Sequence, residues 1–355
     1  MFHFGNRLQV QVFGQSHSPA MGVVIDNFPA GMHIDSERLA AFMERRAPGR
    51  DAFSTRRREP DAVEFLSGVV ENVTTGAPIC AMIRNTDTRS RDYDKLADIP
   101  RPAHADLTAY FKYGNHRDHR GGGEFSGRLT APVCVAGYLA MLLLEEKGIR
   151  VGAHIASVGD VFDDIFSLYV PEEELYAPGK KAFPVLNDEK GLAMQEVILQ
   201  AKGDADSVGG SIECAVTGLP AGVGGSSFDG LEGRIALAAF GIPAVKGIEF
   251  GSGFCGCGKR GSENNDAIRT DGKKIYTETN NAGGILGGIT NGMPVVFRVG
   301  IKPTPSIGKV QKSVSLSRME NTELTVQGRH DPCIVPRAVP VVEAIAALAV
   351  ADCLL

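Results

Sequence analysis

LTAPVCVAGYLAMLLL at residues 129–144 and AVPVVEAIAALAVADCLL at residues 338–355 decide the fold of this chain. Both stretches are apolar around nearly the whole circumference of a helix, which is typical of helices buried on most sides rather than of amphipathic surface helices. We therefore predict that these two helices form the centre of the molecule. Charged residues follow the first stretch and Glu343 and Asp352 interrupt the second, so we expect neither to cross a membrane.

The surrounding segments predict antiparallel strands. Apolar and polar residues alternate at 8–12, 211–217 and 295–301, which indicates strands with one covered face. VIDNFPAGM at 24–32 and AVTGLPAGV at 215–223 each run an apolar strand into a Pro-Ala-Gly turn, and a predicted helix follows each turn. The two turns lie about half the chain apart.

This repeated pattern predicts an α+β fold with helices packed between two antiparallel sheets. We expect a single domain over 1–355 with an internal duplication, its units spanning roughly 8–150 and 205–355. A common Pro-Gly turn that recurs by chance is the open alternative.

A helix is predicted after Asp35 and Ser36, which are good N-cap residues, and Pro48 ends it. This helix brings Arg45 and Arg46 to its C-terminal turn. Arginines are concentrated in this half of the chain, since fifteen of the 23 precede residue 129. A guanidinium fork matches carboxylate and phosphate oxygens, so the cluster predicts an anion site, with a solvated basic face as the alternative.

Composition places the chain among ordinary globular proteins, since 43% of its 355 residues are hydrophobic and 22% are charged. The net charge of −5 and the lack of a recognition module argue against nucleic-acid binding. The N-terminal residues do not resemble a secretory leader. Seven scattered cysteines without metal or redox spacing indicate a reducing compartment. We therefore expect a cytoplasmic protein without a metal site or a membrane partner.

Histidines occur in two polar, glycine-rich stretches. His17 lies in GQSHSPAMG at 14–22, and residues 101–130 hold His104 and His116 with four arginines around a triple glycine. Imidazoles exchange protons near neutral pH, and glycine loops bring backbone amides close to an anion. For His17 a hydrogen-bonded turn residue is the alternative. A metal site is disfavoured because the neighbouring arginines would repel a divalent cation.

Two further segments carry polar groups suited to a ligand. NNAGGILGGITNG at 280–292 precedes a strand that ends at KPTPS, residues 302–306. Glycine pairs let a flat ring or a phosphate approach the backbone, although the order is not that of a dinucleotide-binding fold. GRHDPC at 328–333 adds Arg329 and Asp331, for which a plain salt bridge is the alternative.

Taken together, these stretches resemble the chorismate synthase family. The resemblance covers about residues 13–351 in the family's order, including GQSHSPAMGVVIDNFPAG, STRRREPD, RPAHAD, RGGG, NNAGGILGGITNG, KPTPS, GRHDPC and RAVPV. It implies conversion of 5-enolpyruvylshikimate 3-phosphate to chorismate and phosphate by a 1,4-anti elimination that requires reduced FMN. It also implies a β-α-β sandwich, a homotetramer and a small phosphorylated dicarboxylate substrate. NADPH is one candidate reductant of the flavin, and an external reductant is the other.

Matching positions assign roles to individual residues. The resemblance implies that His17 protonates the reduced flavin, that His104 lies near the leaving phosphate, and that Asp331 helps to remove the C6 proton. The implied substrate contacts are Arg46, Arg101, Arg128 and Arg329. The implied flavin contacts are Ser126, Ala244, Gly287, Lys302, Pro303, Thr304, Pro305, Ser306 and Arg329.

Several contact positions depart from the family pattern. Gln15 and Ser18 replace the acid and the glycine of GESHG, and Ala103 replaces the glycine of RPGHAD. The other departures are a missing arginine near Ala52, and Glu124 and Phe125 in place of the first two residues of RSS. A flavin-binding paralogue with lost or altered activity is therefore the alternative function.

Overall fold

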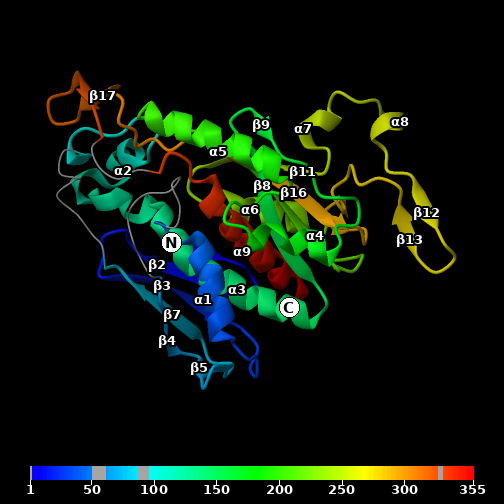
Figure 1. Ribbon diagram of the computed structural model, residues 1–355. Coiled ribbons are helices and arrows are strands. Elements are labelled where there is room, and N and C mark those ends of the chain that lie inside the picture. Colours follow the sequence, from blue (N-terminus) through cyan, green and yellow to red (C-terminus); the bar gives the residue numbers. More distant parts are fainter. Residues whose placement is uncertain (1, 50–60, 87–95, 327–330) are drawn as a thin grey trace.

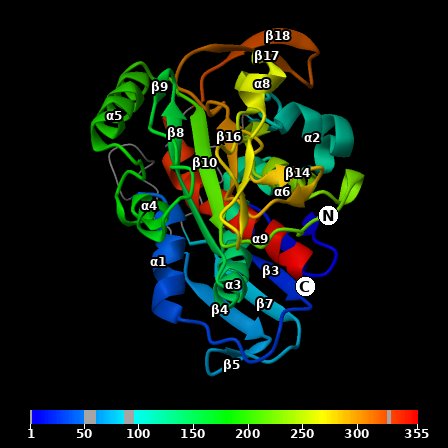
Figure 2. The ribbon, with the colours of Figure 1, turned by 90° about the vertical axis from the view of Figure 1, so that its right-hand side faces the viewer.

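A computed structural model describes residues 2–49, 61–86, 96–326 and 331–355. At its centre, α3 (Thr130–Glu146) and α9 (Val335–Leu354) pack along each other, as Figure 2 shows. Gly137 permits this close approach, because a Cβ placed on it would lie 2.2 Å from the Cβ of Ala344. Most side chains of both helices are buried. The prediction that these two stretches form the centre is confirmed.

Two five-stranded antiparallel sheets enclose the central helices (Figures 1 and 2). The first has the order β1-β2-β3-β7-β4 and contacts α3, and the second has the order β11-β16-β10-β8-β9 and contacts α9. The predicted α+β class, with helices between two antiparallel sheets, is confirmed. The strands are β1 (Phe2–Phe4), β2 (Gln9–Gly14), β3 (Ala20–Asp26), β4 (Val63–Ser67), β7 (Ile79–Arg84), β8 (Arg150–Val158), β9 (Val161–Phe162), β10 (Gly210–Thr217), β11 (Val245–Phe250) and β16 (Val295–Ile301).

The predicted strands at 8–12, 211–217 and 295–301 correspond to β2, β10 and β16. The helix α1 (Ser36–Arg46) begins at the predicted cap, where the carboxylate of Asp35 accepts from two backbone N–H groups at 3.0 Å. It packs on α3 and α9, while α6 (Leu231–Phe240) packs on α9 and β11. The N-cap residue and the alternation of apolar and polar residues therefore predict the positions of α1 and of these three strands correctly.

The two Pro-Ala-Gly turns make the same contacts in the two halves. The Thr74 hydroxyl donates to the carbonyl of Pro29 at 2.7 Å, and the Thr290 hydroxyl donates to that of Pro220 at 2.6 Å. The order β2-β3-β7-β4 also has the same pattern as β8-β10-β16-β11, so the second set of strands begins at residue 150 rather than 205. The internal duplication itself stays a prediction.

The remaining elements lie outside the two large sheets and the central helices. The polar stretch 101–130 contains one short helix and several turns, and β12–β13 form a hairpin that projects from the body beside α7 and α8 (Figure 1). The bounds are β5 (Val69–Val70), β6 (Val73–Thr74), α2 (Asp106–Tyr113), η2 (Gly114–His116), η3 (Arg120–Phe125), η4 (Gly127–Leu129), α4 (Glu172–Tyr176), η5 (Pro178–Lys180), α5 (Asp188–Gly203), η6 (Ser227–Asp229), α7 (Gly253–Gly256), α8 (Gly261–Asn264), β12 (Ile268–Thr270), β13 (Ile275–Thr277), β14 (Ile285–Leu286), β15 (Ile289–Thr290), β17 (Gln311–Ser315) and β18 (Glu320–Leu324).

One helical segment in the described part of the chain, Gly127–Glu146, is long and apolar enough to cross a membrane. Its most apolar window is 83% buried inside the fold. The burial identifies it as the core helix of the sandwich, as the sequence predicted.

Candidate active site

Two buried arginines meet at one buried carboxylate. Nη2 of Arg46, at the end of α1, lies 2.7 Å from Oδ2 of Asp61, and Nη1 of Arg128, in η4, contacts the other carboxylate oxygen. None of the three residues is more than 6% exposed. Burial would raise the pKa of the Asp61 carboxyl, but the charges of the two arginines and their hydrogen bonds outweigh burial and lower it. The cluster therefore holds two guanidinium groups and one carboxylate out of water.

Arg128 is linked to the loop that carries His17. Asn85 accepts from Nε of Arg128 at 3.2 Å, and its amide group donates to the carbonyls of Gln15 at 3.2 Å and Ser18 at 2.8 Å. The Ser18 hydroxyl also accepts from the backbone N–H of Gln15 at 3.0 Å. A serine at this position therefore closes the loop with its own side chain.

The triple glycine lies between the two candidate histidines. A Cβ placed on Gly121 would lie 2.1 Å from Nδ1 of His17, and one placed on Gly122 would lie 3.2 Å from Nε2 of His104. Both glycines have positive φ, at 60° and 87°. The absent side chains allow both imidazoles to approach the same short stretch of backbone.

Arg101 and Asp106 hold His104 from one side. Oδ1 of Asp106 lies 2.7 Å from Nδ1 of His104, and Nη2 of Arg101 lies 3.1 Å from the same nitrogen. The backbone N–H of Asp106 also donates to Nδ1 at 3.2 Å, so this ring nitrogen is held from three sides and Nε2 faces Gly122. Burial lowers the pKa of His104, the hydrogen bond with Asp106 partly opposes this effect, and the charge of Arg101 adds to the lowering. The neutral imidazole is favoured.

Asp106 is itself fixed by Arg101. Nε of Arg101 lies 2.7 Å from Oδ2 of Asp106, and both residues are about 5% exposed. Burial would raise the pKa of Asp106, but its hydrogen bonds with Arg101 and His104 outweigh burial and lower it. The carboxylate therefore stays ionised between the two groups.

The segment 302–306 connects Arg101 with Asp331. Nη1 of Arg101 donates to the hydroxyl of Ser306 at 3.0 Å, and the hydroxyl of Thr304 donates to the backbone carbonyl of Asp331 at 2.9 Å. Pro303 and Pro305 alternate with these polar residues along the segment. The KPTPS segment therefore bridges the His104 side of the site and the start of α9.

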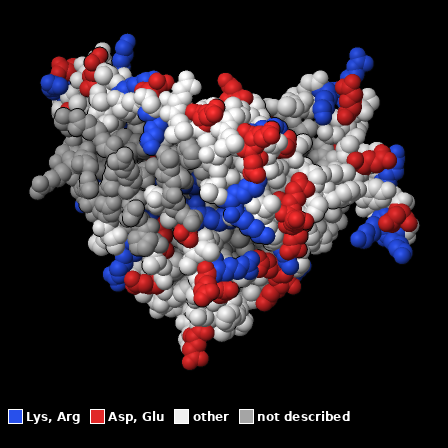
Figure 3. Space-filling view, in the orientation of Figure 1, with Lys and Arg blue, Asp and Glu red and all other residues white. Residues whose placement is uncertain are grey.

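Arg337 completes the network of contacts. Its Nη1 lies 2.6 Å from Oδ2 of Asp331, and its Nε donates to the backbone carbonyl of Arg46 at 3.0 Å. Lys and Arg side chains gather in the middle of the face in Figure 3, beside the residues that the structure does not describe. One network of contacts thus joins segments far apart in the sequence, and it includes His17, His104, Asp331, Arg46, Arg101 and Arg128.

Other sequence-predicted residues are placed differently. Ala244 lies at the Lys302 end of β16, and its carbonyl accepts from the Lys302 backbone N–H at 3.0 Å. Gly287 lies in the β14–β15 hairpin at the opposite end of β16, about 20 Å along the strand. Ser126 caps η4, where its hydroxyl accepts from the Arg128 N–H at 3.3 Å. Arg329 lies outside the described residues.

Sequence reasoning missed the residues that hold the site residues in place. Asp61, Asn85, Asp106 and Arg337 are not among the residues that the sequence predicts for the site. The only sequence signal for Asp61 is its place at the end of the arginine-rich STRRREPD stretch. The partners of Asp61 and Asn85 lie 15 to 70 residues away, and Arg337 reaches Arg46 across 291 residues, so no local pattern identifies these contacts.

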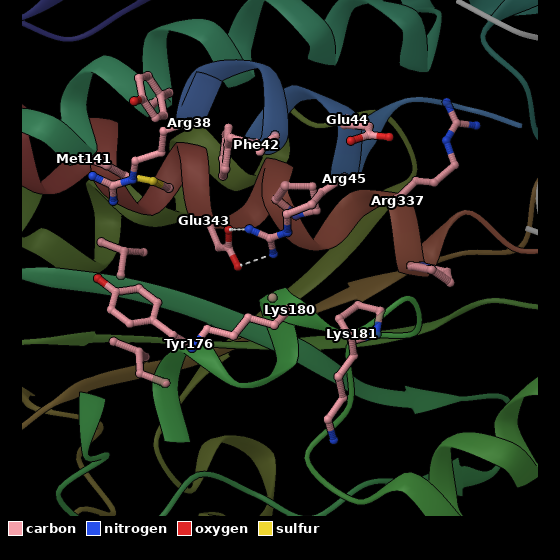
Figure 4. Close-up of a pocket in the computed structure, with 18 of the residues that line it drawn as sticks. Arg38, Phe42, Glu44, Arg45, Met141, Tyr176, Lys180, Lys181, Arg337 and Glu343 are labelled. Atoms are coloured by element: carbon pink, nitrogen blue, oxygen red, sulfur yellow. Dashed lines mark hydrogen bonds and ion pairs between the residues drawn. The ribbon is translucent and has the colours of Figure 1, made fainter. Parts of the chain in front are cut away.

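A separate cavity of about 760 Å³ lies beside α1 (Figure 4). Both guanidinium Nη atoms of Arg45 bind the carboxylate of Glu343 at 2.7 Å in its wall, and Lys180 points into it. Arg45 and Arg46 are consecutive residues of α1, yet they bind different carboxylates. The Arg45 cavity is therefore distinct from the cluster around Asp61.

Comparison with known proteins shows the family of this chain. The family model described as chorismate synthase matches residues 8–355. The chain belongs to the chorismate synthase family. It is 47% identical to the chorismate synthase of Archaeoglobus fulgidus over 357 residues, which cover 99% of this chain and 96% of that protein. It is 45% identical to the chorismate synthase of Korarchaeum cryptofilum over 349 residues, which cover 98% of this chain and 96% of that protein.

A crystal structure of chorismate synthase is also similar, with a TM-score of 0.77 and 29% identity over 99% of this chain and 92% of that one. Chorismate synthases are lyases of the shikimate pathway, and family membership over the whole chain assigns this activity here. Two of the residues that depart from the family pattern, Ser18 and Ala103, stand in the loops that carry the two histidines.

Proposed function

We propose that this site converts 5-enolpyruvylshikimate 3-phosphate to chorismate and phosphate with reduced FMN bound beside the substrate. In this reaction a C–H bond at C6 and the C–O bond to phosphate break, a C=C bond forms, and no net electrons are consumed. The observation that carries the proposal is the contact network that joins three buried arginines, two histidines and Asp331.

The three arginines are proposed to bind the phosphate and carboxylates of the substrate. Arg46, Arg101 and Arg128 are each at most 6% exposed, so an anion that reaches them leaves water and must be paired. Asp61 and Asp106 balance two of these three charges before the substrate arrives. The donor set therefore fits an anion and retains an excess of positive charge.

His104, Asp331 and His17 are proposed to handle protons. A phosphate near Nε2 of His104 would favour the imidazolium, because an opposite charge raises the pKa of a histidine. His104 would then donate to the leaving phosphate. Asp331, whose carboxylate is held by Arg337, is proposed to help in removing the C6 proton. His17 is proposed to donate a proton on the flavin side of the site.

The segment after β16 is proposed to hold FMN. Lys302 uses one of its three N–H donors on a backbone carbonyl at 2.7 Å, which leaves donors for an anionic group, and Thr304 and Ser306 add hydroxyls. Reduced FMN supplies electron density that protein side chains lack. Gly287 fits this proposal only if a second subunit brings its hairpin to the site.

A homotetramer in the cytoplasm is part of the proposal. Ile268 and Ile275 on the projecting β12–β13 hairpin are 67% and 76% exposed, and a second subunit would cover such apolar side chains. All seven cysteines are free thiols, which suits a reducing compartment. Light scattering on the purified protein tests the tetramer, and a monomer would contradict it.

Anaerobic phosphate release from 5-enolpyruvylshikimate 3-phosphate with reduced FMN tests the activity. Wild-type protein should release phosphate, and His17→Ala should release it at least about 100-fold more slowly, which is the size typical of a lost acid-base group. Adding NADPH with oxidised FMN shows whether the enzyme reduces its own flavin. FMN binding without any phosphate release would support the paralogue that has lost its activity.

A further inference from the structure

We propose that Asp61 is a positioning residue that holds Arg46 and Arg128 side by side so that both guanidinium groups address one anion of the substrate. This inference rests on the function proposed for the site. Asp61 is not assigned any contact with reacting atoms, because it acts through the two arginines.

The charges make such a residue necessary. The side chains of Arg46 and Arg128 are 2% and 5% exposed, and two guanidinium groups this close would repel each other out of water. The Asp61 side chain is completely buried and places one oxygen on each arginine. Because each arginine takes a different oxygen, the carboxylate sets their spacing as well as their charge.

Two observations indicate that the pair is kept for a ligand. The buried Nε of Arg46 has no acceptor within the described part of the chain, so it is a donor available to a bound anion. Asp61 also adopts a positive φ of 48°, a backbone conformation that L-residues rarely adopt. Backbone strain of this kind is concentrated at functional sites.

The effect of Asp61 extends to His17. Arg128 donates to Asn85 at 3.2 Å, and Asn85 holds the loop carbonyls of Gln15 and Ser18. A displaced Arg128 would therefore release the loop whose histidine lies against Gly121. Asp61 thus aligns the anion site with the candidate proton donor.

Asp61→Asn is the main test, because it removes the charge and keeps the shape. We expect kcat to fall about 100-fold, the size of a small misplacement of reacting groups, with KM unchanged or lower. Inorganic phosphate should bind about tenfold more tightly by calorimetry, since it replaces the lost carboxylate as partner of the arginines. Unchanged kcat, or unchanged or weaker phosphate binding, would overturn the proposal.

Asp163→Asn is the matched control. Asp163 is also a buried, ion-paired carboxylate, 3.1 Å from His154, but it is not a member of the network around Arg46. It should lower the melting temperature and leave kcat and phosphate affinity unchanged. If Asp61→Asn does not fold, Asn85→Ala tests the link from Arg128 to the His17 loop. We expect kcat of this variant to fall about tenfold. An unchanged kcat would contradict the proposed link.

Phosphate binding separates this proposal from the function on which it rests. If wild-type protein binds phosphate but does not turn over the substrate, the proposed function fails. The difference in phosphate affinity between wild type and Asp61→Asn still decides whether Asp61 positions the arginines.

Discussion

Lys302 donates from its ammonium group to the backbone carbonyl of Ala103 at 2.7 Å, across 199 residues of sequence. Its backbone N–H donates to the carbonyl of Ala244 at 3.0 Å. Both alanines adopt left-handed conformations, with φ of 59° and 74°. Burial, followed by the charge of Lys246, lowers the pKa of Lys302. One lysine thus joins two strained turns at the end of β16.

Ala103→Gly should stabilise the protein by about 0.5 kcal/mol. Glycine removes about 1.5 kcal/mol of strain from the left-handed conformation of the folded state. This gain exceeds the loss of about 1 kcal/mol that comes from the greater entropy of the unfolded chain. Ala103 is exposed, so no packing is lost. Ala105→Gly is the control, because Ala105 has a φ of −72° and should lose stability. Denaturant unfolding measures both, and equal shifts in the two variants would contradict the strain.

Gly121→Ala should lower kcat/KM at least about 100-fold, since its Cβ would lie 2.1 Å from the His17 ring and displace it. Gly148→Ala is the matched control, because Gly148 also has a positive φ, 76° against 60°, after the end of α3 and no atom within 4 Å of the new Cβ. It should cost about 1 kcal/mol of stability and leave activity unchanged. Equal activity losses in both variants would show that strain, not His17, is responsible.

Binding of a dianion should bring a proton to His104. Its pKa is lowered in the free protein, and an anion at Nε2 would raise it. Sulfate, which does not titrate in this range, should therefore bind with uptake of up to about one proton near pH 6.5. Calorimetry in two buffers of different ionisation enthalpy measures this uptake. If His104→Gln took up as many protons as the wild-type protein on binding sulfate, His104 would not be the group that is protonated.

The same lowered pKa affects stability in the absence of ligand. The folded state binds fewer protons at His104 than the unfolded state, so stability falls as the pH drops below about 6.5 toward the folded pKa. The effect should be absent in His104→Gln. Melting temperatures between pH 5 and pH 8 give the comparison.

His154 should show the opposite pH dependence. Its two ring nitrogens lie 3.1 Å from carboxylate oxygens of Asp163 and Glu213. Burial would lower the pKa of His154, but these carboxylates outweigh burial and raise it. The protonated imidazole therefore stabilises the folded protein fully below pH 6.5, and this stabilisation is lost as the pH rises through the raised pKa. Its size is about 1.4 kcal/mol for each unit by which folding raises the pKa. If the melting temperature of a His154→Gln variant declined with rising pH as much as that of the wild-type protein, protonation of His154 would not be the cause.

Much of the fold could be predicted from local patterns. The apolar circumference of α3 and α9 leaves burial between layers as their only favourable place, and alternation predicts β2, β10 and β16. Asp35 supplies the cap of α1 through adjacent backbone groups. These features depend on neighbours in the chain, which the sequence shows directly.

The candidate site was predictable only in part. Motifs indicated His17, His104 and Asp331, but Asp61, Asn85 and Arg337 act through partners whose sequence separation is set by packing. The internal duplication and the flavin contacts stay predictions. Gly287 shows the limit most clearly, since its motif resembles a ligand loop and the structure places it at the far end of β16.

Arg45 and Arg46 show where sequence information ends. As adjacent residues of one arginine-rich turn they are equivalent by composition, and the sequence alone determined that both lie at the end of a buried amphipathic helix. Each residue of a helix is rotated by about 100° from the last, so Arg45 faces Glu343 and Arg46 faces Asp61. Only the docking of α1 against α3 and α9 decided which carboxylate each arginine meets, because those carboxylates come from distant parts of the chain.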